Sequence, residues 1–208
     1  MKKIEKSRRS RRTILDSALE LFSQQGYRAT TVRDIAEKGG LSTGSLYHQF
    51  PDKEAIFQAL LDEYWTAISQ ADYPVNRALA EGAFPDRLED LGRASRDAIE
   101  RYRPYVALIY VDVVEMEGVH IKKFYSDMAQ RFGAFIEGHG DQLGLTEKLR
   151  DDVSPVSAMM LATRTFMHFF AVELLFGVPN HFGKDNETVI HEIADILRHG
   201  MLRSVDAK

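Results

Sequence analysis

The sequence predicts an all-α protein, and three observations lead to this prediction. Apolar residues recur at the spacing of one helix face along most of the 208 residues. Gly and Pro residues divide these stretches into segments of helical length. The one β-branched segment that resembles a buried strand, Tyr105–Met116 (YVALIYVDVVEM), has no partner strand anywhere in the sequence. We therefore expect this segment to be helical as well.

The first fifty residues predict three short helices in succession. Ile14, Ala18, Leu21 and Phe22 form one apolar face of a helix from about residue 9 to Gln25. Gly26 fits a left-handed helix terminus. A second helix is expected to open at Thr31, because Thr31 and Asp34 have the spacing of a capping box.

The third helix of this set is too polar to serve packing alone. Gly39 and Gly40 form the turn before it, Ser42 caps it, and Leu46 is its only obvious buried side chain. A Gly inside a short helix costs about 1 kcal/mol relative to Ala, so Gly44 favours close approach of another backbone. Hydrogen-bonding side chains are left facing outward, as in a recognition helix that enters the major groove: Thr43, Ser45, Tyr47 and His48.

The charge distribution supports a nucleic-acid partner. Seven of the first twelve residues are Lys or Arg, and we interpret them as a flexible cationic arm that follows a phosphate backbone. Residues 1–53 hold 11 Lys/Arg and 6 Asp/Glu, a net charge of +5, whereas residues 54–208 hold 16 and 25, a net charge of −9. Lys53, in the first turn of the next helix, is placed to share a phosphate with free backbone N–H groups. The alternative is a solvated basic tail.

Residues 13–60 resemble the DNA-binding domain of the TetR (tetracycline-repressor-like) family of bacterial transcriptional regulators. Gly39 departs from the family, which more often has Ala there. The resemblance implies that Thr31, Ser45, Tyr47, His48 and Lys53 contact phosphates and bases, and it implies nothing about the effector beyond about residue 70. It covers about a quarter of the chain and rests on Ile14-Leu15, Ala18, Leu21-Phe22, Gly26-Tyr27, Thr31-Val32, Asp34-Ile35-Ala36, Gly40, Ser42, Gly44, Leu46-Tyr47-His48, Phe50, Lys53 and Glu54.

Composition excludes several other classes of protein. The chain has no Cys, hence no disulfide, no thiolate nucleophile and no Cys-based metal site. Gly40–Gly44 matches the Gly-x-Ser-x-Gly elbow of serine hydrolases, but that elbow needs a preceding strand and none is expected. The seven His are scattered, so we expect no metal, no cofactor and no catalytic residue. No apolar run reaches the roughly 18 residues that span a bilayer, and no signal peptide is recognisable. We expect a soluble, cytoplasmic protein.

The rest of the sequence, after residue 53, predicts a second, all-helical domain. Asp52–Ala71 is expected to be a strut helix, so the domains are residues 1–53, with the strut from 52, and residues 54–208. A loop is expected at 72–86, and helices at roughly 86–102, 104–116, 119–138, 151–177 and 186–203.

The last two helices predict a homodimer. Val156–Phe176 is apolar nearly all round, and the final helix carries an apolar stripe. Such helices pair across a two-fold axis as a four-helix bundle. The alternative is that both fill the core of one chain.

Polar residues within apolar helices predict a pocket for an effector. A Tyr, Phe and Met lining with a few polar anchors suits a small apolar or amphipathic molecule. The alternative is an ordinary core with a buried ion pair. The candidates are Tyr105, Ile109, Asp112, Phe124, Met128, Phe132, Arg164 and His168.

Together these features predict a dimeric transcriptional regulator, namely a repressor that a small apolar or amphipathic effector releases from a palindromic double-stranded operator. The alternative function is a helical small-molecule-binding protein or enzyme whose basic head is incidental.

Overall fold

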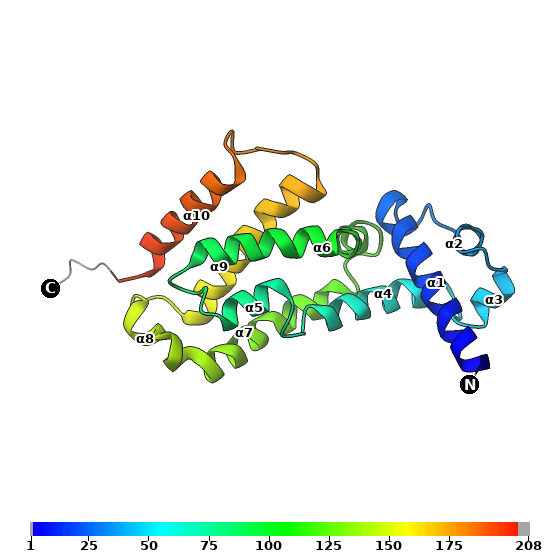
Figure 1. Cartoon of the computed structure of the whole chain (residues 1–208), viewed down its shortest axis with the longest axis horizontal. Coiled ribbons are helices and arrows are strands. Elements are labelled where there is room, and N and C mark those ends of the chain that lie inside the picture. Colours follow the sequence, from blue (N-terminus) through cyan, green and yellow to red (C-terminus); the bar gives the residue numbers. More distant parts are fainter. Residues whose placement is uncertain (1, 204–208) are drawn as a thin grey trace. The chain divides into compact units, whose positions relative to one another are not determined.

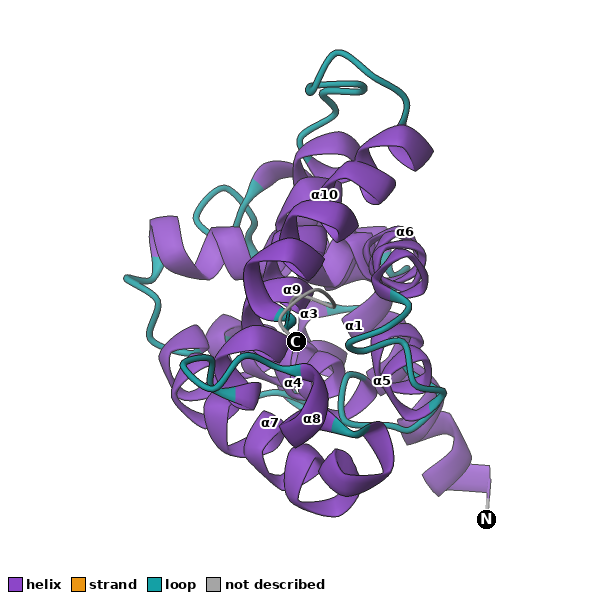
Figure 2. Cartoon of the chain, turned by 90° about the vertical axis from the view of Figure 1, so that its left-hand side faces the viewer, coloured by secondary structure: helices purple, strands orange, loops and turns teal. Residues whose placement is uncertain are grey.

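The computed structural model describes residues 2–203, and every regular element within that range is a helix (Figure 1, Figure 2). The predicted all-α class is therefore confirmed, and Tyr105–Met116 falls almost entirely within a helix. The elements are α1 Lys2–Gln25, α2 Val32–Lys38, α3 Thr43–Tyr47, α4 Lys53–Ala67, α5 Pro74–Ala80, α6 Leu88–Glu115, α7 Ile121–Leu143, α8 Leu145–Lys148, α9 Pro155–Phe170, the π-helical turn η1 Ala171–Leu175 and α10 Asn186–Met201.

The chain divides into two compact units. The first comprises Met1–Ala67 and Pro104–Phe124, and the second comprises Ile68–Arg103 and Tyr125–Lys208. The chain passes from the second unit to the first within α6, where Tyr102 leaves helical geometry (φ −110°, ψ 18°). The domain boundary expected at 53/54 stays a prediction.

The core of the first unit joins α1–α4 to the second half of α6. Phe22, Phe57 and Leu46 are fully buried in one apolar cluster, and Leu108 of α6 belongs to the same cluster. The rings of Phe22 and Phe57 meet edge to face with centroids 5.5 Å apart, a favourable arrangement for aromatic pairs. Helices α1–α4 therefore share one core with a segment distant in sequence.

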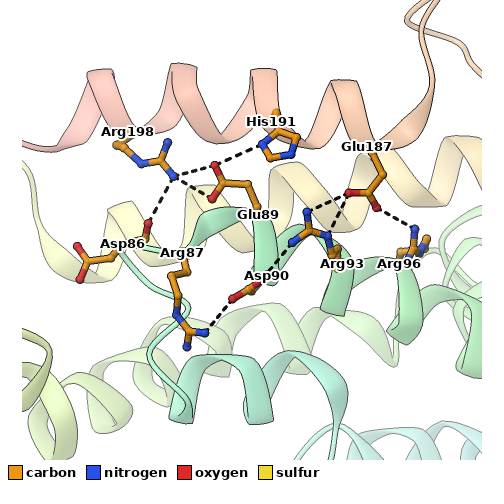
Figure 3. A network of polar contacts seen from close by, with 9 residues as sticks. All are labelled: Asp86, Arg87, Glu89, Asp90, Arg93, Arg96, Glu187, His191 and Arg198. Carbon is orange, nitrogen blue, oxygen red and sulfur yellow. Dashed lines mark hydrogen bonds and ion pairs between the residues drawn. The ribbon is translucent and has the colours of Figure 1, made fainter.

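In the second unit, the first half of α6 packs closely against α9 and α10. A Cβ atom at Gly92 would lie 2.9 Å from Cε1 of Phe166 and 3.0 Å from Cγ2 of Ile190, so only Gly permits this approach. Charged residues continue the contact along α6 and α10 (Figure 3). Arg198 donates to both carboxylate oxygens of Glu89 at 2.9 Å, and Arg93 pairs with Glu187 at 3.0 Å.

Three predicted boundaries were wrong. α1 begins at Lys2 rather than near residue 9, so the basic arm is helical. No Gly or Pro interrupts this segment, and its many Lys and Arg residues favour helices. The expected loop at 72–86 contains α5, whose first residue is Pro74, a favourable start for a helix. The two helices expected at 86–102 and 104–116 form the single kinked α6.

The expectation that no apolar run is long enough to span a bilayer did not anticipate the helical segment Pro155–Leu175, which has 21 residues. By length and composition alone it could cross a membrane, although half of its most apolar window is buried inside the protein. The core helix of a globular domain meets the same criterion, and the buried side chains Phe166 and Phe170 place this segment in such a core.

Candidate nucleic-acid interface

The start of α2 is built by a reciprocal capping box, as predicted. The backbone N–H of Asp34 donates to Thr31 Oγ1 at 3.1 Å, and the backbone N–H of Thr31 donates to Asp34 Oδ2 at 2.8 Å. The Thr31 hydroxyl also donates to the same carboxylate at 2.7 Å, and these hydrogen bonds lower the pKa of Asp34. The Thr31 hydroxyl proton is therefore used within the protein, and a phosphate contact by Thr31 stays a prediction.

The third helix, α3, begins with a simpler cap, in which only the side chain of Ser42 takes part. Gly40 takes a φ of +63° in the turn, and Ser42 Oγ accepts a hydrogen bond from the backbone N–H of Ser45 at 3.1 Å. The hydroxyls of Ser42 and Ser45 lie 3.0 Å apart. Leu46 is the buried residue of α3. The predicted cap and buried anchor are thus confirmed, and both serines have a structural partner.

The other four predicted contact residues on or next to α3 are exposed. Thr43, Tyr47 and His48 form no side-chain hydrogen bond or ion pair with residues 2–203, and 55 % of the Tyr47 surface is accessible. A Cβ atom at Gly44 would meet only Ser42 Oγ, at 3.9 Å, which is ordinary contact. The fold therefore leaves this face free, and it does not itself require Gly at position 44.

Lys53 is more enclosed than the sequence indicates. Its Nζ donates to the backbone carbonyls of Tyr27 at 2.7 Å and Thr30 at 2.8 Å, and lies 4.1 Å from the centre of the Tyr27 ring. Burial lowers the pKa of Lys53, and the nearby charge of Glu115 opposes this effect. Two of the three ammonium protons therefore tie α4 to the turn between α1 and α2. A phosphate contact through the remaining proton stays a prediction.

Glu115, at the end of α6, braces the same turn and was missed by sequence reasoning. Its carboxylate accepts a hydrogen bond from the backbone N–H of Arg28 at 2.6 Å, and its carbonyl accepts one from the Arg28 guanidinium at 3.0 Å. A Cβ atom at Gly26, where φ is +89°, would collide with the Glu115 carboxylate. Gly26 is thus favoured by its left-handed backbone conformation, and its lack of a side chain leaves room for the Glu115 carboxylate.

The predicted effector residues fall in both units. In the first unit, Asp112 is fully buried, and its carboxylate accepts hydrogen bonds from Nδ1 of His120 at 2.7 Å and from the backbone N–H of Ile121 at 2.9 Å. These contacts make it a cap for the start of α7. The Tyr105 hydroxyl donates to Glu63 at 3.1 Å, and burial, then the Glu63 charge, raises the pKa of Tyr105. Ile109 and Phe124 are half-buried in the same unit.

In the second unit, the predicted polar anchors are exposed rather than buried. Arg164 and His168 lie one turn apart on the outer face of α9, and the Arg164 guanidinium is 5.3 Å from the Tyr125 ring centre. The expectation of burial was wrong because the opposite face of α9 makes the core contacts. Met128 and Phe132 are half-buried on α7. Ligand contacts by all eight candidates stay predictions.

An open polar hollow of about 500 Å³ lies elsewhere in the second unit. Its lining contains none of the predicted effector residues: Asp72, Pro74, Arg77, Asp97, Glu100 and Arg101. Within residues 2–203, no group of three or more His, Asp or Glu side chains is suited to hold a metal ion.

Residues 14–60, which contain the second half of α1, all of α2 and α3 and the start of α4, match the family described as "Bacterial regulatory proteins, tetR family". This part of the chain is thus similar to the N-terminal region of TetR-family regulators. It is 39 % identical over 101 residues to the HTH-type transcriptional repressor KstR2 of Mycobacterium tuberculosis, covering 48 % of each chain, and 39 % identical over 108 residues to KstR2 of Rhodococcus jostii, covering 50 % of each. The chain thus spans about half the length of the curated relatives it matches.

Solved structures of TetR-family and related regulators share the fold over nearly the whole chain. The KstR2 structure from Mycobacterium tuberculosis, described as a ketosteroid transcriptional regulator, has a TM-score of 0.53 at 22 % identity and covers 93 % of this chain and 95 % of its own. NalD of Pseudomonas aeruginosa, described as the secondary repressor of the MexAB-OprM multidrug efflux pump, has a TM-score of 0.61 at 19 % identity and covers 95 % and 99 %. These similarities establish the all-helical TetR fold.

Proposed function

We propose that this TetR-family chain is a cytoplasmic, homodimeric repressor that binds a palindromic DNA operator. The observation that carries the proposal is the exposed face of α3. Thr43, Tyr47 and His48 are exposed and have no side-chain hydrogen bond or ion pair with residues 2–203, and they lie beside a Gly that the fold does not need. A helix of this kind can read base edges in the major groove while neighbouring groups fix the phosphates.

The exposed faces of α9 and α10 support the dimer. Leu161 on the largely apolar α9 is 60 % accessible, and Ile196 on the amphipathic α10 is 71 % accessible. Most of the apolar stripe of α10, including Ile190, Ile193 and Ala194, is instead buried within the chain. Arg164 and His168 lie on the same outer face of α9 as Leu161. Pairing these faces across a two-fold axis covers the apolar side chains and gives the charged ones a partner chain. Two recognition helices then reach successive major grooves, about 34 Å apart.

The open packing of α7 supports a small apolar or amphipathic effector. Ile121 is the buried residue of this 23-residue helix, while Met128, Phe132 and Phe135 on one face are half-buried. Such a surface suits a ligand that packs against aromatic and Met side chains. The described functions of the two relatives, a ketosteroid regulator and a repressor of a multidrug efflux pump, agree with this chemistry. An effector that favours the DNA-free state by about 1–3 kcal/mol would lower the affinity for the operator about 5–150-fold.

The proposal can be tested in one titration series. Purified protein is titrated into a fluorescent duplex carrying the DNA upstream of its own gene, and steroids, fatty acids and planar drugs are then added. We expect saturable binding by two chains per duplex and release by at least one apolar class. Sedimentation of the free protein as a monomer at micromolar concentration would overturn the dimer. Release only by sugars or nucleotides would overturn the effector class.

A further inference from the structure

The first ten described residues of α1, residues 2–11, form a helical basic extension beside the recognition helix. The helix is continuous from Lys2 to Gln25, so these residues are an integral part of the element that packs in the core. Together with Arg12 they carry seven Lys or Arg and one Glu, which gives residues 2–12 a net charge of 7 − 1 = +6. The side chains of Lys2 and Lys3 lie outside the described residues.

Two contacts fix the basic extension to the segment that directly follows α3. The side-chain amide of Gln49 donates to the Ser7 hydroxyl at 2.9 Å. One turn further along α1, the guanidinium of Arg11 lies 4.2 Å above the centre of the Phe50 ring, a cation–π contact. Because Phe50 is itself buried in the core, these contacts join the basic extension to the segment that follows α3.

The cations of α1 differ in whether their charge is already neutralised. Arg12 is paired with Glu63 at 2.9 Å and with Asp16 at 2.8 Å, and its pKa is raised because hydrogen bonding and charge from Glu63 outweigh burial, which lowers it. In contrast, Lys6, Arg8 and Arg9 are exposed, and their charged groups form no ion pair with the described residues. These three charges are free to bind an anion.

We propose that the basic extension is a second DNA-binding surface, which contacts the sugar–phosphate backbone beside the bases that α3 reads. The inference rests on the proposed function. Lys6, Arg8 and Arg9 bind phosphates, whereas Ser7 and Arg11 are positioning residues that keep these cations in register with the recognition helix. Because the extension is already helical and fixed, binding does not have to order a flexible arm. The surface therefore adds affinity at a defined distance from the operator bases.

Salt dependence of DNA binding tests the charge contribution. The triple variant Lys6→Ala, Arg8→Ala, Arg9→Ala retains good helix-forming residues. Each lost phosphate contact reduces the slope of log K against log salt by about 0.9, so three contacts reduce it by about 2.7 for each chain and by about 5.4 for the two chains bound to one duplex. Arg12→Ala is the matched control, because its charge is internally paired and the slope should change by well under 0.9. An unchanged slope in the triple variant, measured on a mixed-sequence duplex, would overturn the inference.

Hydroxyl-radical footprinting tests the position of the contact. A duplex is first selected from a random pool by the wild-type protein. We expect wild type to protect backbone positions beyond the bases contacted by α3, and the triple variant to lose only these outer protections. Ser7→Ala with Gln49→Ala, which leaves every charge in place, should weaken the outer protections severalfold and spare the inner ones. Identical outer protections in all variants would overturn the inference alone, whereas absence of any DNA binding by wild type would overturn the proposed function as well.

Discussion

Replacing Gly44 by Ala should keep or raise the stability of the protein and weaken its binding to DNA. Gly44 has helical backbone geometry within α3, and a Cβ atom there would meet only Ser42 Oγ, at 3.9 Å. Ala favours a helix over Gly by up to about 1 kcal/mol, which corresponds to a rise in Tm of about 2–4 °C for a chain of this size. The free variant should therefore be as stable as wild type or more stable.

The same methyl group should weaken DNA binding, because it occupies the space into which the DNA backbone would fit. Forcing an extra methyl group into a well-packed contact costs about 1–3 kcal/mol, which is about 5–150-fold in Kd. The assay combines thermal unfolding with fluorescence anisotropy on the duplex. Gly138→Ala on α7 is the matched control, since a Cβ atom at Gly138 meets nothing within 4 Å. A folded Gly44→Ala protein that binds DNA as tightly as wild type would refute the placement of this helix against DNA.

Tyr47→Ala should leave Tm unchanged and weaken binding about tenfold or more on all duplexes; equal affinity by anisotropy would contradict an exposed DNA-facing ring. Lys53→Met removes two charge-assisted hydrogen bonds, so the free energy of unfolding should fall by about 1–3 kcal/mol; an unchanged denaturation midpoint would contradict the structural role of Lys53. Burial raises the pKa of Glu173, but hydrogen bonds from Asn180 and His181 outweigh it and the pKa is lowered. Its stabilising contribution is therefore complete above the unfolded pKa of about 4.3 and is lost as pH falls through the lower folded value. Glu173→Gln should flatten the pH dependence of unfolding in that acidic window; identical pH profiles for the two proteins would show that this carboxylate contributes nothing.

Local signals in the sequence were sufficient for the helices that present the candidate DNA interface. The caps at Thr31 and Ser42 involve partners three residues away, so their spacing predicts the starts of α2 and α3. The exposed side chains of α3 could be predicted because Leu46 is the buried residue of this short helix. The start of α1 was misplaced because the density of positive charge suggested a solvated arm, although nothing in residues 2–12 breaks a helix.

Contacts between distant parts of the chain could not be predicted from the sequence. Glu115 accepts a hydrogen bond from Arg28, which is 87 positions away in the sequence, and no periodicity or spacing links the two residues. The burial of Asp112 was expected, but its partner His120 was not, because a carboxylate in an apolar helix can face a ligand or a helix end equally well. The exposure of Arg164 depends on which face of α9 packs inward, and an almost uniformly apolar helix does not specify that face.

Specific binding to DNA tests the central claim most directly. Anisotropy at about 150 mM salt compares the duplex from upstream of the gene with a mixed-sequence duplex of equal length. Specific protein–DNA complexes have Kd values of about 10⁻⁸–10⁻¹¹ M, typically 10³–10⁷-fold tighter than non-specific binding. The exposed face of α3 predicts a ratio in that range, with two chains bound per duplex. Equal affinity for the two duplexes, measured with fully folded protein, would contradict the assignment of α3 as a recognition helix for that DNA.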